Sequence, residues 1–157
     1  MKHLPFILFL IAIFSFSKLS VGQDVIRQQP CEDSYIKHEV DSIKELMSTK
    51  GFVVVKEASM EMVSEYEMPI VVPLTAGSWY QFVFIGDIGS RLYEVRMYDY
   101  EERQVAYEKK MWGDVDGNVI SFDYIPKVSE YHMIKPVQIN KKKKKVCGYV
   151  MLLKRVA

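Results

Sequence analysis

The sequence predicts a mainly β protein, an antiparallel β-sandwich of about eight or nine strands with one amphipathic helix near its N-terminus. Two observations come from the centre of the chain. Residues 78–86 are almost all apolar or aromatic, which is typical of a strand covered on both faces, whereas residues 91–99 alternate between apolar and polar side chains. The third observation is that strand-like segments separated by turns recur every ~8–12 residues along most of the remaining chain.

The central strands and the helix can be assigned faces from their spacing. In residues 91–99, the core face carries Tyr93, Val95 and Met97, and the outward face carries Glu94, Arg96 and Tyr98. A helix is expected over residues 33–49, where Ile36, Val40, Ile43 and Met47 form one apolar stripe. Asp33 or Ser34 can cap its start, and Gly51 is placed to end it. We expect the stripe to pack on the sheet.

The other strands are shorter and less regular. We expect them at residues 52–55, 60–67, 70–74, 104–108, 118–124, 131–139 and 146–155. Residues 113–118 (GDVDGN) have the composition of a turn, and Lys141 to Lys145 form a charged loop. Pro136 interrupts the strand at 131–139.

The N-terminus has the pattern of an export signal. Lys2 and His3 precede an apolar run from Leu4 to Phe16, and small residues follow it up to Gly22. The run is shorter than the ~20 residues of a membrane span, so we predict a signal peptide at 1–22, with an uncleaved anchor as the alternative. Residues 23–32 would then be a tether ahead of a single domain at 33–157. This organisation predicts a secreted or periplasmic protein.

The charge balance argues against several partner classes. The chain has 21 Lys and Arg and 20 Asp and Glu, and residues 1–22 contain two of the lysines and no acid. Removing them leaves a net charge of about −1, which provides no electrostatic basis for binding nucleic acid. No second apolar stretch approaches the length of a membrane span, and no motif predicts a cofactor.

Several short motifs resemble the bacterial pre-peptidase C-terminal domain. They are LTAGSWYQFVF at 74–84, RMYD at 96–99, FDYIP at 122–126, SEY at 129–131 and GYVML at 148–152. The resemblance covers about residues 70–155 and implies a small jelly-roll-like sandwich carried by secreted proteins, some of which bind ligands or calcium. The chain departs from the family at Leu92, which replaces an acid, and at Glu130, which replaces a glycine. An enzyme domain usually precedes this module, and here a helix and two or three strands do.

Few residues have the spacing of a catalytic or metal site. Asp114, Asp116 and Asn118 could offer oxygen ligands to calcium, but a tight turn explains the same residues and is the favoured interpretation. His38 and His132 have no cysteine or second histidine at motif spacing, which favours solvated or capping histidines. A carboxylate hydrolase stays open as an alternative, with candidate acids Glu61, Glu65, Glu94, Asp99 and Asp123.

Two groups of residues could bind a ligand. Arg96, Tyr98, Tyr100 and Trp112 would make a platform for a sugar or a peptide if their side chains are exposed, whereas a second sheet or the helix could instead cover them. Lys141, Lys142, Lys143, Lys144 and Lys145 could hold an anion, although an ordinary solvated loop explains them as well.

The two cysteines are expected to form a disulfide. Both Cys31 and Cys147 lie beyond the predicted signal peptide, and export would bring them into an oxidising compartment. The alternative is a buried thiol at Cys147 and an intermolecular bond at Cys31. Together these features predict a secreted, non-catalytic β-sandwich module that binds a glycan, a peptide or a partner protein. A small hydrolase, or a structural or inhibitory partner of another secreted protein, are the alternatives.

Overall fold

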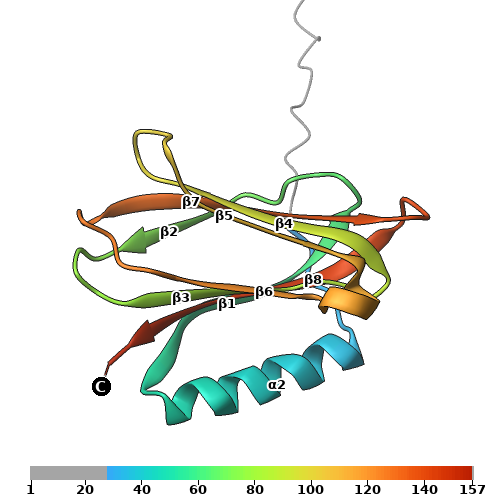
Figure 1. Cartoon of the computed structure of the whole chain (residues 1–157), viewed down its shortest axis with the longest axis horizontal. Helices are drawn as coiled ribbons and strands as arrows, with labels where there is room; N and C mark the ends of the chain where they lie inside the picture. Colours follow the sequence, from blue (N-terminus) through green and yellow to red (C-terminus); the bar gives the residue numbers. More distant parts are fainter. Residues whose placement is uncertain (1–27, 157) are drawn as a thin grey trace, which may run out of the picture.

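The structure is a computed structural model that describes residues 28–156. Eight antiparallel strands form two four-stranded sheets, ordered β1-β8-β3-β6 and β2-β7-β4-β5. Their bounds are β1 Phe52–Val63, β2 Ile70–Leu74, β3 Tyr80–Ile85, β4 Ser90–Tyr98, β5 Gln104–Met111, β6 Val119–Tyr124, β7 Glu130–Asn140 and β8 Lys145–Arg155. Strands β4 and β5 pair, as do β3 and β6, β2 and β7, and β1 and β8. This nested pairing is a long hairpin rolled into a jelly roll, as the sequence predicts (Figure 1).

The main core lies between the two sheets, where the alternating side chains meet. Tyr93, Val95 and Met97 of β4 are buried, as the alternation predicts. Phe82 and Phe84 of β3 face them from the other sheet within one apolar cluster. Each fully buried side chain of this size stabilises the fold by ~1.5–3 kcal/mol through removal of apolar surface from water.

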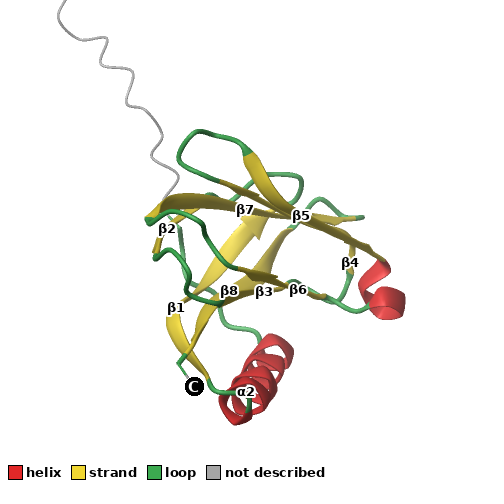
Figure 2. Ribbon diagram, turned by 60° about the vertical axis from the view of Figure 1, so that its left-hand side comes forward, coloured by secondary structure: helices red, strands yellow, loops and turns green. Residues whose placement is uncertain are grey.

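Helix α2 (Ser34–Thr49) covers the outer face of the β1-β8-β3-β6 sheet (Figure 2). Its buried residues Ile36, Val40 and Met47 pack on a second apolar cluster that includes Val83 and Ile85 of β3. Strand β3 is therefore covered on both faces, which explains its nearly continuous apolar sequence. The helix begins where the Asp33 carboxylate accepts a hydrogen bond from the Ile36 N–H at 2.9 Å.

Strand β1 is one strand, and the prediction of two strands at 52–55 and 60–67 is wrong. A bulge between Val54 and Lys56 lets pairing with β8 continue through the polar residues that appeared to separate the two. The strand ends at Val63, and Glu65 follows with a φ of 76°. Glu65 and Glu67 therefore lie in the connection to β2 rather than on the strand.

Strand β7 runs through Pro136 without interruption. The Pro136 carbonyl accepts a hydrogen bond from the N–H of Met68 at 3.1 Å, and Met68 lies in the β1–β2 connection, just before β2 begins. In an antiparallel strand the N and the carbonyl of one residue point to the same side, so the missing N–H of Pro136 also faces this connection. The proline therefore removes no hydrogen bond from the ladder with β4.

The predicted signal peptide lies outside the described residues, as does the first half of the predicted tether, residues 23–27. Its last residues lie on the sandwich: the Gln29 carbonyl accepts a hydrogen bond from the Glu61 N–H at 2.8 Å, along the edge strand β1. The predicted disulfide is present between Cys31 and Cys147, whose Cα atoms are 5.7 Å apart. Within residues 28–156, no helix has the length and apolar character needed to cross a membrane.

A buried polar network closes one end of the sandwich. The Gln138 side-chain carbonyl accepts hydrogen bonds from the Asp87 N–H at 2.9 Å and the Ser90 hydroxyl at 3.1 Å. The Tyr93 hydroxyl donates to the Asp87 carbonyl at 2.6 Å. Burial is the main cause that raises the pKa of the Tyr93 hydroxyl above its ordinary value. The network fastens the β3–β4 loop to the central strand β7, and thereby positions the β4 residues that follow the loop.

Candidate functional site

The outer face of the β2-β7-β4-β5 sheet has no helix or strand over it among the described residues (Figures 1 and 2). Strand register places its side chains in rows, with Met133 between Val71 and Tyr98, and Arg96 between Lys135 and Tyr107. We call this surface the open face and define it by Glu67, Val71, Glu94, Arg96, Tyr98, Tyr107, Lys109, Met133 and Lys135. The sequence left open whether a second sheet or the helix covers Arg96 and Tyr98. Neither covers them among the described residues.

Arg96 is the centre of a row of ion pairs across the open face. Its guanidinium contacts the Glu94 carboxylate at 2.7 Å and the Glu67 carboxylate at 3.1 Å. Glu67 also contacts Lys135 at 3.1 Å, and Glu94 contacts Lys109 at 3.8 Å. Because each acid lies between two cations, the row is electrostatically satisfied and holds the Arg96 side chain in one orientation.

Aromatic and apolar side chains flank this row. The Arg96 guanidinium lies 6.0 Å from the Tyr107 ring centroid, and the Lys135 ammonium lies 5.3 Å from the Tyr98 ring centroid. Tyr107 and Met133 are 44% and 38% exposed. The open face therefore offers rigid aromatic and flexible apolar surface around charged groups whose positions are already fixed.

The four residues that the sequence suggested as a binding platform do not lie together. Arg96 and Tyr98 lie at the centre of the open face. Tyr100 follows β4 at one end of the sheet, where it lines a shallow groove of about 460 Å³ with Tyr131. Trp112 begins the π-helical turn η1 (Trp112–Asp116) after β5, at the opposite end, and its ring centroid lies 5.4 Å from the Lys141 ammonium.

Several residues of the open face were not predicted to belong to a site. Lys135, Met133 and Tyr107 alternate with inward residues in segments that were expected to be strands, so the register of β4 with its neighbours would have found them. Glu67 could not be found in this way because it lies in a loop, and its contact with Arg96 depends on how that loop folds back.

The calcium candidates serve different structural roles. Asn118 is 2% exposed, and its amide donates to the Glu39 carboxylate at 2.7 Å and to the Gly86 carbonyl at 2.8 Å. Burial raises the pKa of Glu39, and the hydrogen bond from Asn118 partly offsets this effect. Asp114 and Asp116 are exposed on the η1 turn. Over residues 28–156, no group of three or more His, Cys, Asp or Glu side chains is placed to hold a metal ion.

The candidate acids of a hydrolase lie on separate parts of the molecule. Glu61 and Asp123 are on β1 and β6, the two opposite edge strands of one sheet, whereas Glu94 is on the other sheet. Glu65 is in the β1–β2 connection. The Asp99 carboxylate is 2.8 Å from the Arg103 guanidinium; desolvation raises its pKa, but the Arg103 hydrogen bonds outweigh this and lower it.

The histidines differ from one another. His38 is exposed on α2, as expected for a solvated side chain. His132 is 1% exposed and its ring nitrogen Nε2 lies 3.2 Å from the Tyr124 hydroxyl, so the interpretation of His132 as a solvated or capping residue is wrong. It points into the space between the sheets because β7 places it on the same face as Ile134. The sequence did not predict this because the residues on both sides of His132 are also large, so the alternation does not show which face is buried.

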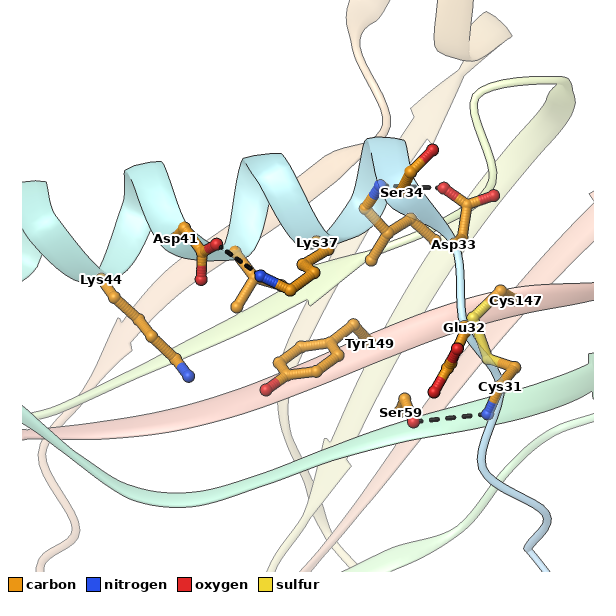
Figure 3. Close-up of a pocket in the computed structure, with 12 residues that line it drawn as sticks. Cys31, Glu32, Asp33, Ser34, Lys37, Asp41, Lys44, Ser59, Cys147 and Tyr149 are labelled. Atoms are coloured by element: carbon orange, nitrogen blue, oxygen red, sulfur yellow. Dashed lines mark hydrogen bonds and ion pairs between the residues drawn. A yellow bond between two sulfur atoms is a disulfide. The ribbon is translucent and has the colours of Figure 1, made fainter.

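A cavity of about 580 Å³ forms a groove where α2 meets the edge of its sheet (Figure 3). Tyr149 and the Cys31–Cys147 disulfide lie along one side, and Lys37 and Asp41 of the helix form a 3.1 Å ion pair on the other. Lys44 reaches across to Glu57 of β1, to which the Tyr149 hydroxyl also donates at 2.6 Å. Burial and the Glu57 carboxylate raise the pKa of Tyr149. These contacts hold α2 on the sheet.

Comparison of the sequence with family models and with curated proteins found no match. Solved structures with a similar fold include the pre-peptidase C-terminal domain of a collagenase from Bacillus anthracis, at 10% identity and a TM-score of 0.46 over 62% of this chain and 87% of that chain. PliG of Aeromonas hydrophila, a periplasmic inhibitor of g-type lysozyme, has 10% identity and a TM-score of 0.48 over 68% and 90%. TmCBM61, in complex with β-1,4-galactotriose, has 15% identity and a TM-score of 0.38 over 68% and 83%.

The predicted resemblance to the pre-peptidase C-terminal domain is thus confirmed, at low identity. Because all three TM-scores are below 0.5, these likenesses carry no argument about a ligand or a partner.

Proposed function

We propose that this protein is a non-catalytic binding module that acts outside the cytoplasm and docks a partner protein on its open face. The observation that carries the proposal is that α2 covers the outer face of one sheet, whereas the open face has no covering element within residues 28–156. The Cys31–Cys147 disulfide supports an oxidising location, because such bonds persist mainly in exported proteins.

The composition and shape of the open face favour a protein as the partner. Tyr, Met and Arg are enriched in protein interfaces, and Tyr107, Met133 and Arg96 are all present. The three cations and two acids of the row leave a net charge of only +1, so a partner need not be strongly charged. We therefore expect a folded protein with a flat, nearly neutral surface that offers hydrogen-bonding groups to the row and apolar groups to Tyr107 and Met133.

The arrangement of the acids supports a non-catalytic role. General acid–base hydrolysis of a glycosidic bond needs two carboxyl groups flanking one bond, within ~10 Å of each other. The candidate acids lie on different sheets and edges, and Glu94 is held between Arg96 and Lys109.

A capture experiment with matched variants tests the proposal. The mature protein is used as bait in the extracellular fraction of its own source cells, in wild-type form, as R96A/Y107A, and as Y35A/K37A. Tyr35 and Lys37 are exposed on α2, so the control removes the same kinds of side chain from the opposite side of the molecule. We expect one protein to be captured by the wild type and the control and lost with R96A/Y107A. Equal capture by all three baits would contradict the proposal.

A neutral glycan is the second candidate, and a different observation favours it. Tyr100 and Tyr131 are 74% and 59% exposed and line the same groove with Ser129 and Glu130. Exposed aromatic rings beside hydroxyl and carboxylate groups can pack on one face of a sugar and bond its hydroxyls. A glycan array in which Y100A/Y131A loses a signal that R96A/Y107A keeps would establish this candidate, and an array without signal would remove it.

A further inference from the structure

A second surface lies at the end of the open face that is marked by Trp112. Met111 pairs with Leu92, and Leu92 pairs with Ile139, so the chain segments that follow Met111 and Ile139 leave the sheet next to each other. As a result the η1 turn adjoins the β7–β8 loop, and the Lys141 ammonium lies over the Trp112 ring. We call this surface the basic end and define it by Trp112, Lys141, Lys142, Lys143, Lys144 and Lys145.

The lysines of the basic end are only partly neutralised. Lys145 contacts the Glu61 carboxylate at 2.6 Å, and Lys143 contacts Glu65 at 3.7 Å. Lys141, Lys142 and Lys144 form no ion pair with any residue in the described part of the chain. Three ammonium groups on one short loop without a counter-charge raise the local potential and attract anions, although the protein as a whole is near neutral.

The loop that carries these lysines has a defined shape despite their mutual repulsion. The Asn140 side chain accepts a hydrogen bond from the Lys144 N–H at 2.9 Å and donates one to the Lys144 carbonyl at 2.7 Å. The Asn140 carbonyl accepts another from the Lys143 N–H at 3.2 Å. Since Asn140 itself is 7% exposed, the loop is fastened to the core and its ammonium groups are partly pre-organised.

Trp112 is also held in a fixed position. Its φ is 57°, a conformation that bulky residues rarely adopt, and its side chain is 43% exposed. The next residue, Gly113, is buried against the Tyr93 side chain, which anchors the turn. Beside the turn, a shallow cavity of about 560 Å³ is lined by Lys110, Met111 and Asp116, together with Lys109 of the open face. The indole ring is therefore presented next to the lysines rather than packed in the core.

We propose that the basic end binds an acidic polysaccharide, one whose sugars carry carboxylate or sulfate groups. The CH groups on one face of a sugar ring can pack on the Trp112 indole as apolar surface. Acid groups of neighbouring sugars then pair with Lys141, Lys142 and Lys144. This site is separate from the open face, so it gives the module a second ligand of a different chemical class.

An acidic polysaccharide fits this surface better than an anionic membrane. Val115, the most exposed apolar side chain of the turn at 77%, lies between Asp114 and Asp116. Those two carboxylates oppose insertion of the turn into an anionic bilayer. A linear polymer can instead lie across the ring and the lysine loop without burying the acids.

The test measures binding of the mature protein to heparin and to polygalacturonate at low and high salt, with neutral dextran as the reference. Variant K141S/K142S/K144S removes the three lysines without ion pairs, and K37S/K50S/K127S removes the same charge from other exposed positions. We expect the first variant to bind at least one polyanion about tenfold more weakly, and the second to bind nearly as the wild type does. W112A should lose about fivefold and W112F less, because a ring remains.

Three results would overturn the proposal. One is the absence of binding to both polyanions at low salt, and another is equal loss in the two lysine variants. The third is unchanged binding by W112A, which would reduce the site to charge alone. Binding to vesicles rich in phosphatidylglycerol and to a single-stranded DNA oligomer is measured in parallel. If either one binds more strongly than the two polysaccharides do, the ligand is a membrane or a nucleic acid and the proposal is overturned as well. These outcomes do not test the open face, because the two sites are separate. We therefore expect the open-face variant R96A/Y107A to bind the polyanions as the wild type does.

Discussion

The disulfide between Cys31 and Cys147 joins the segment ahead of α2 to the last strand, across a sequence separation of 116 positions. Cys147 pairs in register with Glu61 of the edge strand β1, and the Cys31 N–H donates to the Ser59 hydroxyl of the same strand at 3.3 Å. The bond therefore closes the sandwich at the edge where the chain enters it, and it limits how far the N-terminal segment can move away from β1.

The first prediction concerns this bond. Because it closes a loop of more than a hundred residues, the chain-entropy model gives a stabilisation of up to about 5 kcal/mol. We expect C31S/C147S to lower the free energy of unfolding by ~2–5 kcal/mol in urea titrations. Wild-type protein with a reductant should show the same loss. A double variant as stable as the oxidised wild type would mean that the bond contributes nothing to the fold.

The second prediction concerns the close packing of Gly113 on Tyr93. A Cβ at position 113 would overlap the Tyr93 hydroxyl and come within 2.7 Å of the Ile88 carbonyl oxygen. We expect G113A to destabilise the protein by about 1–3 kcal/mol. Y93F should also be destabilising, since it removes the hydroxyl that donates to the Asp87 carbonyl and leaves that carbonyl with the Ser90 N–H, at 3.0 Å, as its remaining donor.

In the double variant G113A/Y93F the overlap with the hydroxyl is gone. Its loss of stability should therefore be smaller than the sum of the two single losses, as measured in a double-mutant cycle. Strict additivity would show that the hydroxyl is not the group that the new methyl meets.

The third prediction concerns pH. Burial raises the pKa of Glu57, but hydrogen bonds from Lys44 and Tyr149 outweigh this effect and lower the pKa below its ordinary value of 4.5. A depressed pKa in the folded state means that ionised Glu57 stabilises the fold above about pH 4.5 and that this contribution is lost as the pH falls through the folded-state pKa.

E57Q should therefore cost a few tenths to about 1 kcal/mol at pH 7, because the site is partly exposed and screened. At pH 3 the difference between wild type and E57Q should shrink. Urea titrations at the two pH values measure it, with D41N as a control for a more exposed acid of the same groove. A difference that does not change with pH would contradict the assignment.

The fourth prediction separates the lysine side chains from the loop that carries them. Replacing all of Lys141 to Lys145 with Ser should leave the melting temperature nearly unchanged, because the side chains are exposed and the loop is held by Asn140. N140A should be destabilising by ~1–2 kcal/mol, since it removes both side-chain hydrogen bonds to Lys144. The reverse order of effects would mean that the lysines are structural.

Much of the fold could be predicted because periodicity reports burial directly. The apolar run of β3 predicted a strand between the core and a covering element, and that element is the helix whose stripe includes Ile36 and Val40. The alternation of β4 predicted which of its side chains face the core. The predicted gap in β1 was wrong because Lys56 and Glu57 belong to an exposed part of an edge strand, where polar residues are compatible with pairing.

The candidate site was harder to predict because it depends on contacts between distant segments. Arg96 was expected to face outward, but its partner Glu67 is in a loop whose path no pattern indicates. Trp112 and Lys141 were assigned to two separate groups, and they meet because β4 lies between β5 and β7. Tyr100 and Trp112 were grouped with Arg96 although the sheet places them at its opposite ends.

Site-specific photo-crosslinking tests most directly whether a partner protein docks on the open face. A photoreactive residue is placed at Met133, on the open face, or at Leu46, which is 53% exposed on α2. The two proteins are then irradiated in the extracellular fraction that contains the partner. We predict a covalent adduct with one protein from position 133, and none from position 46. An adduct from position 46 alone would contradict the account, because it would place the partner on the helix rather than on the uncovered sheet.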